Sequence, residues 1–496
     1  EEDPEAAVKA LNNCYTYLGN MDEQLYSEAM TDNAYTKQPN DFTQNIGNGS
    51  YSTADSYVKQ VWDGRYTGIR MCNQLLENID RVPDLDPELK KRYIGEAKVL
   101  RAYNYYELYT KFGDVPYTTK VLSIKESMSI ARTDRATVIA NMLADLDEVI
   151  NGNYLPASYD ADNKGRITRW AAMAIKAKIY LFEGNWTQVK NITSTIMTEG
   201  GFRLFGSYAG LFEIANEYNS EVILDAQYRP TSREHQMMYA FLPPSLGGYS
   251  QLSPLQELVD SYIMLDGKTI RETGTSFDES NPYANRDPRL KATVMYTGNS
   301  YTLADGTEVV INCEKGEGKD GYGVGSDCSA TGYYIKKYWD NTYRATLYSG
   351  LNPILIRYAD ILLMNAEALA ELGELDKTAW DATIKPIRDR AGFTLASAVE
   401  FPEGASKDKL IEIVRNERRS ELALEGHRHK DIIRWRIADN VLNGWCHGLK
   451  TNDVVGTDDG YVRVENRTFN ANRHYLWPIP QAERDLNGNL EQNPNW

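Results

Sequence analysis

The sequence predicts a mostly α-helical protein in which a scaffold of helix pairs carries a loop-rich insertion with short strands. Two observations support this fold class. Small and aromatic residues recur at helical spacing in long segments of both halves of the chain, and a glycine closes these segments. In the middle, Pro, Gly, Asn, Ser and Tyr dominate. We expect one domain, with the scaffold at 1–200 and 351–496 and the insertion at 201–350.

The first helical segment covers residues 92–117. Ala97, Tyr103 and Leu108 fall near one face of a helix of 3.6 residues per turn, and further tyrosines lie beside them. Gly113 ends the helix, because glycine adopts the left-handed backbone of a helix terminus without steric cost. A helix that is apolar and aromatic around so much of its circumference must pack between neighbours, so this segment predicts a helical array.

Two later segments have the pattern of a helix hairpin, with turns at Gly184 and Gly373. Ala177 and Ala366 each lie seven residues before the turn glycine, and a large residue lies four before it. Tetratricopeptide helix pairs place residues in this way, because their helices cross closely at a small side chain. The turns do not follow one constant repeat length, which indicates an interrupted array. A last helix is expected over residues 408–439.

Two regions lack helical periodicity and are expected to form loops. One is the stretch 33–57, NAYTKQPNDFTQNIGNGSYSTADSY, and the other is the insertion, where EVILDAQY and EVVINCE are the strand-like runs. Long loops on a rigid frame often carry function, so both regions are predicted to contain the site.

Composition excludes several classes of protein. The chain has a formal net charge of -16 at pH 7 and a pI near 5.0, with no block of Lys and Arg, so nucleic acid is not an expected partner. No apolar run is long enough to cross a bilayer. The chain opens at EEDPEAAVKAL, already within a helical pattern, and we expect that any targeting segment has been removed.

The five cysteines form no CxxC pair, so a zinc site is not expected. Cys313 and Cys328 flank a glycine-rich stretch; their spacing leaves open whether they form a disulfide or remain two thiols.

Several motifs resemble cofactor or catalytic sites but lack the context that these sites need. The glycines of residues 316–321 match GxGxxG, yet no helix follows that could hold a pyrophosphate, so a loop is predicted. Residues 160–171 resemble a calcium loop, but Ala171 stands where a bidentate Glu is required, so a turn is predicted. The histidines form no cluster and no nucleophile elbow occurs, so no metal, cofactor or serine triad is expected.

Glu417, Glu421 and Glu425 recur at intervals of four and could in principle serve a hydrolase. Arginines are interleaved with them, and this favours ion pairs over the raised pKa that a general acid needs. We therefore expect no enzyme.

Aromatic and polar residues of the loops remain as the predicted ligand site. Tyrosine is frequent, with 34 residues against 11 phenylalanines. A sugar ring can stack its C–H face on an aromatic plane, while carboxylate, amide and guanidinium groups bind its hydroxyl groups. The predicted contacts are Asp32, Tyr35, Phe42, Asn45, Tyr51, Tyr283, Tyr333, Trp339 and Tyr343.

Blocks spread over nearly the whole chain resemble the SusD/RagB family of Bacteroidetes surface lipoproteins. The presence of all these blocks in the same order indicates the family more specifically than any single block does. The blocks include VWDGRYTGIRMCNQLLENID (61–80), GEAKVLRAYNYYELYTKFGDVPY (95–117), RWAAMAIKAKIYLFEGNW (169–186), LQELVDSYIMLDGKTI (255–270), NPILIRYADILLMNAEAL (352–369), RNERRSELALEGHRHKDIIRW (415–435) and HYLWPIPQAERDLNGNLEQNPNW (474–496).

The resemblance implies a SusD-like fold, with four tetratricopeptide-like helix pairs beside a loop-rich half that binds ligand. It also implies a lipid-anchored protein on the outer face of the outer membrane, which captures oligosaccharide or polysaccharide for a SusC-like TonB-dependent transporter without catalysis. The family's lipid-attachment cysteine is not present before Glu1, and we attribute this to processing.

Three other functions stay open. A peptide-capturing, RagB-like subunit would favour basic peptides, because acidic residues lie near the predicted site: Asp32, Asp278, Glu279 and Asp287. A glycosidase would need two carboxylates at catalytic separation. A pure tetratricopeptide scaffold would not need the long Tyr-rich insertion.

Overall fold

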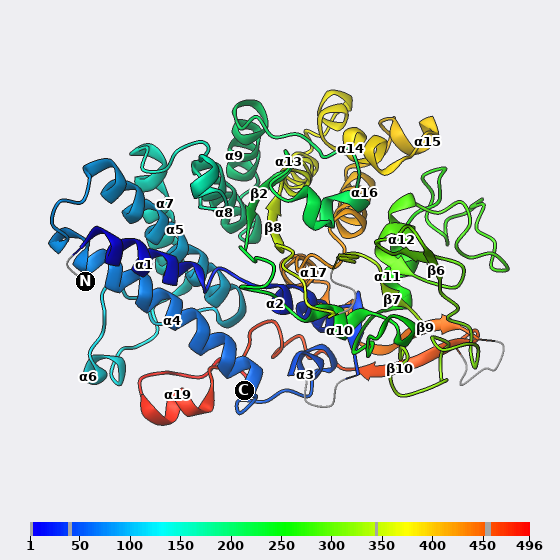
Figure 1. The fold of residues 1–496 in the computed structure, drawn as a ribbon, viewed down its shortest axis with the longest axis horizontal. Coiled ribbons are helices and arrows are strands. Elements are labelled where there is room, and N and C mark those ends of the chain that lie inside the picture. The colour runs from blue at the N-terminus through cyan, green and yellow to red at the C-terminus, as the bar shows by residue number, and fades with distance from the viewer. Residues whose placement is uncertain (1–2, 38–41, 343–345, 452–457) are drawn as a thin grey trace.

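The computed structural model describes residues 3–37, 42–342, 346–451 and 458–496, with the side chain of Phe42 excepted. Its longer helices are α1 (Pro4–Tyr15), α4 (Ser56–Asn78), α5 (Pro87–Phe112), α7 (Arg135–Asn151), α8 (Arg169–Phe182), α9 (Trp186–Glu199), α13 (Tyr358–Leu372), α14 (Lys377–Ala391) and α16 (Lys407–Glu421). The shorter helices are α2 (Met21–Tyr26), α3 (Phe42–Asn48), α6 (Ile124–Ser127), α10 (Met237–Phe241), α11 (Gln256–Ser261), α12 (Pro288–Thr293), α15 (Ala396–Val399), α17 (Arg428–Arg434), α18 (Ala438–Val441) and α19 (Gln481–Leu486). The predicted mostly α-helical fold is confirmed. Figure 1 shows α1, α4, α5 and α7 at one end, α12, β6 (Glu308–Val310) and β7 (Tyr334–Ile335) of the insertion at the other, and α13, α14 and α16 along the upper side.

The predicted helix hairpins are present. α8 and α9 turn at Gly184 and α13 and α14 turn at Gly373, both with positive φ, and α5 ends directly before Gly113. Ala177 and Ala366 are completely buried, as expected of small residues at a close helix crossing. These turns could be predicted because a glycine after an apolar helical pattern is a local signal.

The predicted helix over 408–439 is wrong. α16 ends at Glu421 and α17 begins only at Arg428, and the turn between them contains Leu424 and Gly426 with φ of 63° and 77°. A left-handed backbone cannot continue a right-handed helix, and leucine adopts it only where the surroundings compensate. Here the turn brings Glu425 into a buried group of charges.

This group, the charged seam, joins the insertion to the C-terminal helices through five cations and five carboxylates, and each side chain is at most 7% exposed. Arg357, at the start of α13, contacts carboxylate oxygens of three glutamates at 2.6–2.7 Å. Glu417, Glu421 and Glu425 are thus ion-paired, as expected, but their partners come from other segments and not from the arginines interleaved with them in the sequence. The seam comprises Glu221, Asp287, Arg289, Lys337, Arg357, Arg388, Arg390, Glu417, Glu421 and Glu425.

The described strands form two-stranded antiparallel sheets: β1 (Ala34–Thr36) with β3 (Leu252–Pro254), β2 (Val222–Asp225) with β8 (Ile354–Arg357), β4 (Val294–Met295) with β7 (Tyr334–Ile335), β5 (Ser300–Thr302) with β6 (Glu308–Val310), and β9 (Gly444–Lys450) with β10 (Tyr461–Arg467). The runs EVILDAQY and EVVINCE therefore contain strands, as predicted. Residues 33–37 and 42–57 of the predicted loop contain regular secondary structure, because they contribute β1, α3 and the start of α4.

The GxGxxG stretch and residues 160–165 form turns, as predicted. In the described part of the chain no group of three metal-binding side chains occurs. The five cysteines, including Cys313 and Cys328, are buried free thiols.

Candidate functional site

The residues predicted near the N-terminus have structural partners. Asp32 is 5% exposed and accepts hydrogen bonds from Arg428 at 2.8 Å, and Arg419 lies 3.0 Å away. Burial raises its pKa, but the two guanidinium groups outweigh this and hold the pKa well below its usual range. Tyr51 is 3% exposed and packs on His474. These two predicted contacts hold parts of the fold together.

The remaining predicted residues divide into separate neighbourhoods. The structure brings Tyr283 and Tyr333 together, with their hydroxyl oxygens 3.2 Å apart. Trp339 donates through Nε1 to the carbonyl oxygen of Thr302 at 2.8 Å. The others are placed as follows: half-buried Tyr35 on β1 beside Gln44, half-buried Asn45 on α3 beside Asp55, and Tyr343 and the Phe42 side chain outside the described residues.

Three tyrosines that were not predicted form an exposed aromatic surface, here called the tyrosine platform: Tyr239, Tyr249 and Tyr348. Tyr249 is 48% exposed and Tyr348 37%. The rings of Tyr239 and Tyr249 have centroids 5.8 Å apart and planes 25° apart, while Tyr348 stands at 86° to Tyr239 with centroids 6.5 Å apart. Large rings exposed together in this way are typical of a binding surface.

A rigid base holds the platform in place. Tyr239 is part of α10, whose Met238 and Phe241 are completely buried. The Tyr249 N–H donates to the carbonyl oxygen of Tyr239 at 2.8 Å, which fixes the loop after α10. Ser349, next to Tyr348, exchanges backbone hydrogen bonds of 2.9 and 3.0 Å with His235. Rings that are already positioned lose little conformational entropy when a ligand stacks on them.

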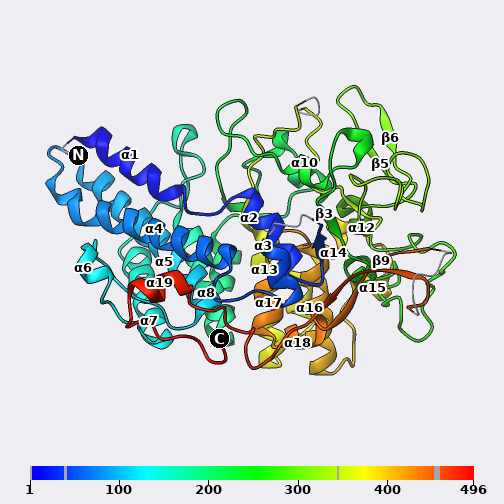
Figure 2. The ribbon, with the colours of Figure 1, turned by 90° about the horizontal axis from the view of Figure 1, so that it is seen from below.

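A cleft of about 390 Å³, here called the α2 cleft, lies along α2. Tyr26 lines it and donates from its hydroxyl to Gln251 Oε1 at 3.2 Å, two residues from Tyr249. Figures 1 and 2 both place α2 beside α10. The lining combines aromatic and polar groups: Tyr17, Asn20, Asp22, Tyr26, Tyr57, Gln60 and Arg65. Platform and cleft together could hold a polar ligand longer than one ring.

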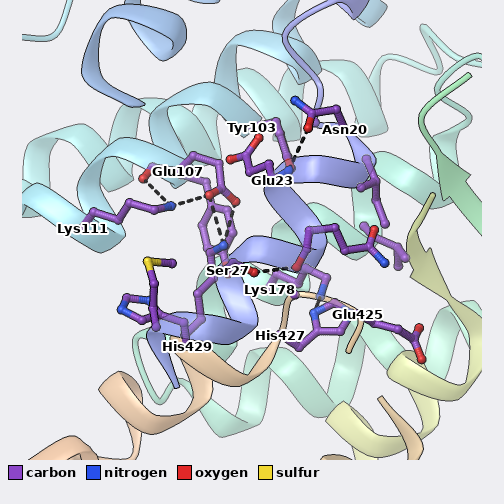
Figure 3. Close-up of a pocket in the computed structure, with 18 of the residues that line it drawn as sticks. Asn20, Glu23, Ser27, Tyr103, Glu107, Lys111, Lys178, Glu425, His427 and His429 are labelled. Atoms are coloured by element: carbon purple, nitrogen blue, oxygen red, sulfur yellow. Dashed lines mark hydrogen bonds and ion pairs between the residues drawn. The ribbon is translucent and has the colours of Figure 1, made fainter. Parts of the chain in front are cut away.

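Deeper inside lies a polar cavity of about 100 Å³, drawn in Figure 3, which shares Asn20, Glu23 and other lining residues with the α2 cleft. Lys111 donates to Glu107 at 2.6 Å there, and burial lowers its pKa to about 8. Burial also lowers the pKa of His427 to about 3, so this ring is neutral at pH 7. A cavity of this size is smaller than ligand pockets, which exceed about 300 Å³, and suits a few waters.

No sequence signal distinguished the platform tyrosines from the buried ones. Each stands close to turn residues, in MMYAFLPPSLGGYS and TLYSG, and that pattern favours surface loops. Yet Tyr333, in the similar context ATGYY, is 2% exposed. The exposure of a tyrosine in the insertion is set by long-range packing.

His447 on β9 bridges two carboxylates and predicts a pH effect. Its Nδ1 lies 2.7 Å from Glu257 Oε1 and its Nε2 lies 3.0 Å from Asp458 Oδ2. The hydrogen bond to Glu257, and then that to Asp458, raise the pKa of His447 above 6.5. The stabilisation is therefore complete below pH 6.5 and is lost as the pH rises through the folded-state pKa.

We expect His447→Gln to lower the stability by up to about 1 kcal/mol at about pH 6 and by much less at about pH 9. Thermal unfolding of both proteins at the two pH values measures this. A difference in Tm that is the same at both pH values would contradict it.

The fold and the platform define a class of protein: a helical scaffold that presents exposed aromatic rings on a loop-rich half. A family model described as "SusD family" matches residues 211–496, and one described as "Starch-binding associating with outer membrane" matches residues 6–181. The first match covers more than half of the chain, so the protein belongs to the SusD family, as the sequence blocks indicated.

Relatives agree with this assignment. SusD-like protein P25 of Formosa agariphila is 27% identical over 410 residues, which cover 78% of this chain and 71% of the relative; SusD-like protein P2 of the same organism is 26% identical over 469 residues, covering 92% and 83%. A solved SusD-like carbohydrate binding protein from Bacteroides fragilis is similar with a TM-score of 0.86 and 27% identity, covering 99% of each chain. None of the described helices is long and apolar enough to span a membrane.

Proposed function

We propose that this protein is a non-enzymatic glycan-binding lipoprotein of the outer-membrane surface. It captures oligosaccharide or polysaccharide and delivers it to a SusC-like TonB-dependent transporter. The observation that carries the proposal is the tyrosine platform on the loop-rich half of a fold shared with a SusD-like carbohydrate binding protein. The family description "associating with outer membrane" supports the location.

The platform has the chemistry that a sugar chain requires. A pyranose ring stacks the C–H groups of its face on a tyrosine plane and leaves its hydroxyl groups at the edge. Polar groups of the neighbouring α2 cleft, such as Asp22 and Gln60, are positioned to bind such hydroxyl groups. Because Tyr348 is nearly perpendicular to Tyr239, the rings offer contacts to two faces of a chain.

The arrangement of the acidic residues favours glycan over basic peptide. Asp32 and Asp287 are buried and paired with arginines, Glu279 pairs with Lys450 at 3.1 Å, and Asp278 accepts hydrogen bonds from Ser280. A peptide cation that bound Asp32 or Asp287 would have to displace a buried arginine, which is costly. Asp278 and Glu279 are exposed and their partners cost little to displace, so only these two acids are open to a basic peptide.

The helical scaffold and the insertion have different proposed roles. We propose that the helices of 1–200 and 351–496 dock the transporter, while the insertion at 201–350 binds the glycan. Of the contacts predicted from sequence, Tyr35, Asn45, Tyr283 and Trp339 are partly exposed and are proposed as outlying contacts of a long ligand. Phe42 and Tyr343 keep the same proposed role.

Native affinity electrophoresis against plant, fungal and host polysaccharides tests the proposal. At least one polysaccharide class is expected to retard the protein, and no reducing sugar should be released. If no polysaccharide retards it, while basic peptides bind with a strong dependence on salt, the glycan-binding proposal is wrong.

A further inference from the structure

Two arginines face each other across a tight hairpin in the insertion. Arg229 and Arg233 exchange both backbone hydrogen bonds, with N···O distances of 2.8 and 2.9 Å, and form an antiparallel bridge. Residues paired in this way lie about 5.5 Å apart at Cα and project their side chains to the same side. Both residues are exposed. The backbone therefore holds two guanidinium groups close together.

Within the described chain, no carboxylate forms an ion pair with either arginine. The guanidinium of Arg233 lies over the ring of Tyr228, 5.0 Å from its centroid, and this orients the group without neutralising it. Like charges directly opposite each other in a strand pair are destabilising. Arg357, in contrast, is buried and paired with three glutamates.

The hairpin is held in a strained form beside the platform. Thr231, at its tip, has φ of 66°, which a β-branched residue adopts only under constraint. A Cβ on Gly350 would lie 2.3 Å from the nitrogen of Pro230, so only glycine allows this close approach. The pairing of His235 with Ser349 then ties the hairpin to the segment that carries Tyr348. Strain of this kind is retained at ligand-binding sites.

We propose that Arg229 and Arg233 form an oxyanion clamp, which binds a carboxylate or sulfate group of the glycan stacked on the tyrosine platform. The inference rests on the proposed function and narrows its substrate class to acidic glycans. A guanidinium group offers two parallel N–H donors to an oxyanion. Two guanidinium groups side by side can therefore both bind the same acidic group, or each bind one of two neighbouring acidic groups. The bound anion removes the repulsion between the two arginines.

Matched pairs of polysaccharides test the clamp: polygalacturonate against its methyl ester, and a sulfated galactan against its desulfated form. Within each pair, the second polysaccharide lacks the negative charge of the first but has the same sugar backbone. Wild type is expected to bind at least one charged member about 10-fold more tightly than its neutral partner. The pair that shows this preference distinguishes a carboxylate ligand from a sulfate ligand.

The double variant Arg229→Ala/Arg233→Ala is expected to bind the charged member no more tightly than the neutral one. Arg229→Lys/Arg233→Lys keeps the charge but loses the planar donors, and should retain only part of the preference. The control Lys9→Ala/Lys125→Ala removes two exposed positive charges elsewhere, and its affinity for the charged glycan should stay within about twofold of that of wild type. Unchanged circular dichroism establishes that each variant is folded.

The clamp is overturned if the double alanine variant binds the charged glycan as tightly as wild type. It is also overturned if wild type binds the neutral member of each pair equally well. In both cases the proposed function stands, provided that binding still requires Tyr249. Failure of wild type to bind any glycan overturns both proposals.

Discussion

Arg357→Met is expected to lower the free energy of unfolding by about 3–5 kcal/mol, because it leaves buried carboxylates without a cation. Arg357 is 1% exposed, and its guanidinium donates to Glu221, Glu421 and Glu425 at 2.6–2.7 Å. Burial raises the pKa of Glu421, but Arg390, Arg357 and Arg289 outweigh it and hold the pKa well below 4.5. Methionine fills the volume but cannot compensate three charges. Urea denaturation measures the change.

Two controls accompany this variant. Lys377→Met removes a cation whose side chain is 54% exposed and paired with Asp381, and should change stability by less than about 1 kcal/mol. Arg357→Lys keeps the charge with fewer donors, so an intermediate loss is expected. A loss below about 1 kcal/mol for Arg357→Met would contradict the role of the charged seam.

The seam also predicts acid sensitivity. A carboxylate whose pKa is lowered in the folded state stabilises it fully above the unfolded pKa of 4.5, and this contribution is lost as the pH falls through the folded value. We expect the stability of wild type to fall steeply below pH 4.5 and that of Arg357→Met to fall less steeply. An equally steep fall in the stability of the two proteins below pH 4.5 would contradict this expectation.

Tyr249→Ala/Tyr348→Ala is expected to weaken glycan binding about 30-fold, which corresponds to about 2 kcal/mol for the loss of two stacking surfaces. Both rings are exposed, and Tyr239 remains as the third ring of the platform. The stability should change little, because exposed side chains contribute little to the core. Isothermal titration calorimetry with the glycan found by electrophoresis measures the change.

Trp445→Ala is the matched control, because Trp445 on β9 is 42% exposed and lies outside the platform. Binding should be unchanged in this variant. Loss of affinity in Trp445→Ala with wild-type affinity in the tyrosine variant would move the site to β9 and β10.

The helical scaffold could be predicted because its signals are local. The 3.6-residue spacing of apolar residues and the turn glycines Gly184 and Gly373 lie within single segments. The break between α16 and α17 was missed, although Gly426 is the same kind of local signal as Gly184 and Gly373. The left-handed backbone of Leu424 has no such signal, because leucine is a good helix former. That turn is stabilised by Arg357 and Lys337, which contact Glu425 from about 70 to 90 positions away in the chain.

The site was less predictable for the same reason. The composition of the insertion directed attention to tyrosines, but it could not separate exposed Tyr249 from buried Tyr333. Asp32 has the residue type of a sugar contact and the surroundings of a structural ion pair, and only the fold shows the two arginines beside it. Exposure and pairing depend on tertiary contacts that periodicity does not encode.

A crystal structure of the protein with its tightest-binding oligosaccharide tests the central claim most directly. The account predicts sugar rings stacked on Tyr249 and Tyr348, with the chain continuing toward the α2 cleft. A sugar bound elsewhere, with these two rings left uncovered, would contradict it.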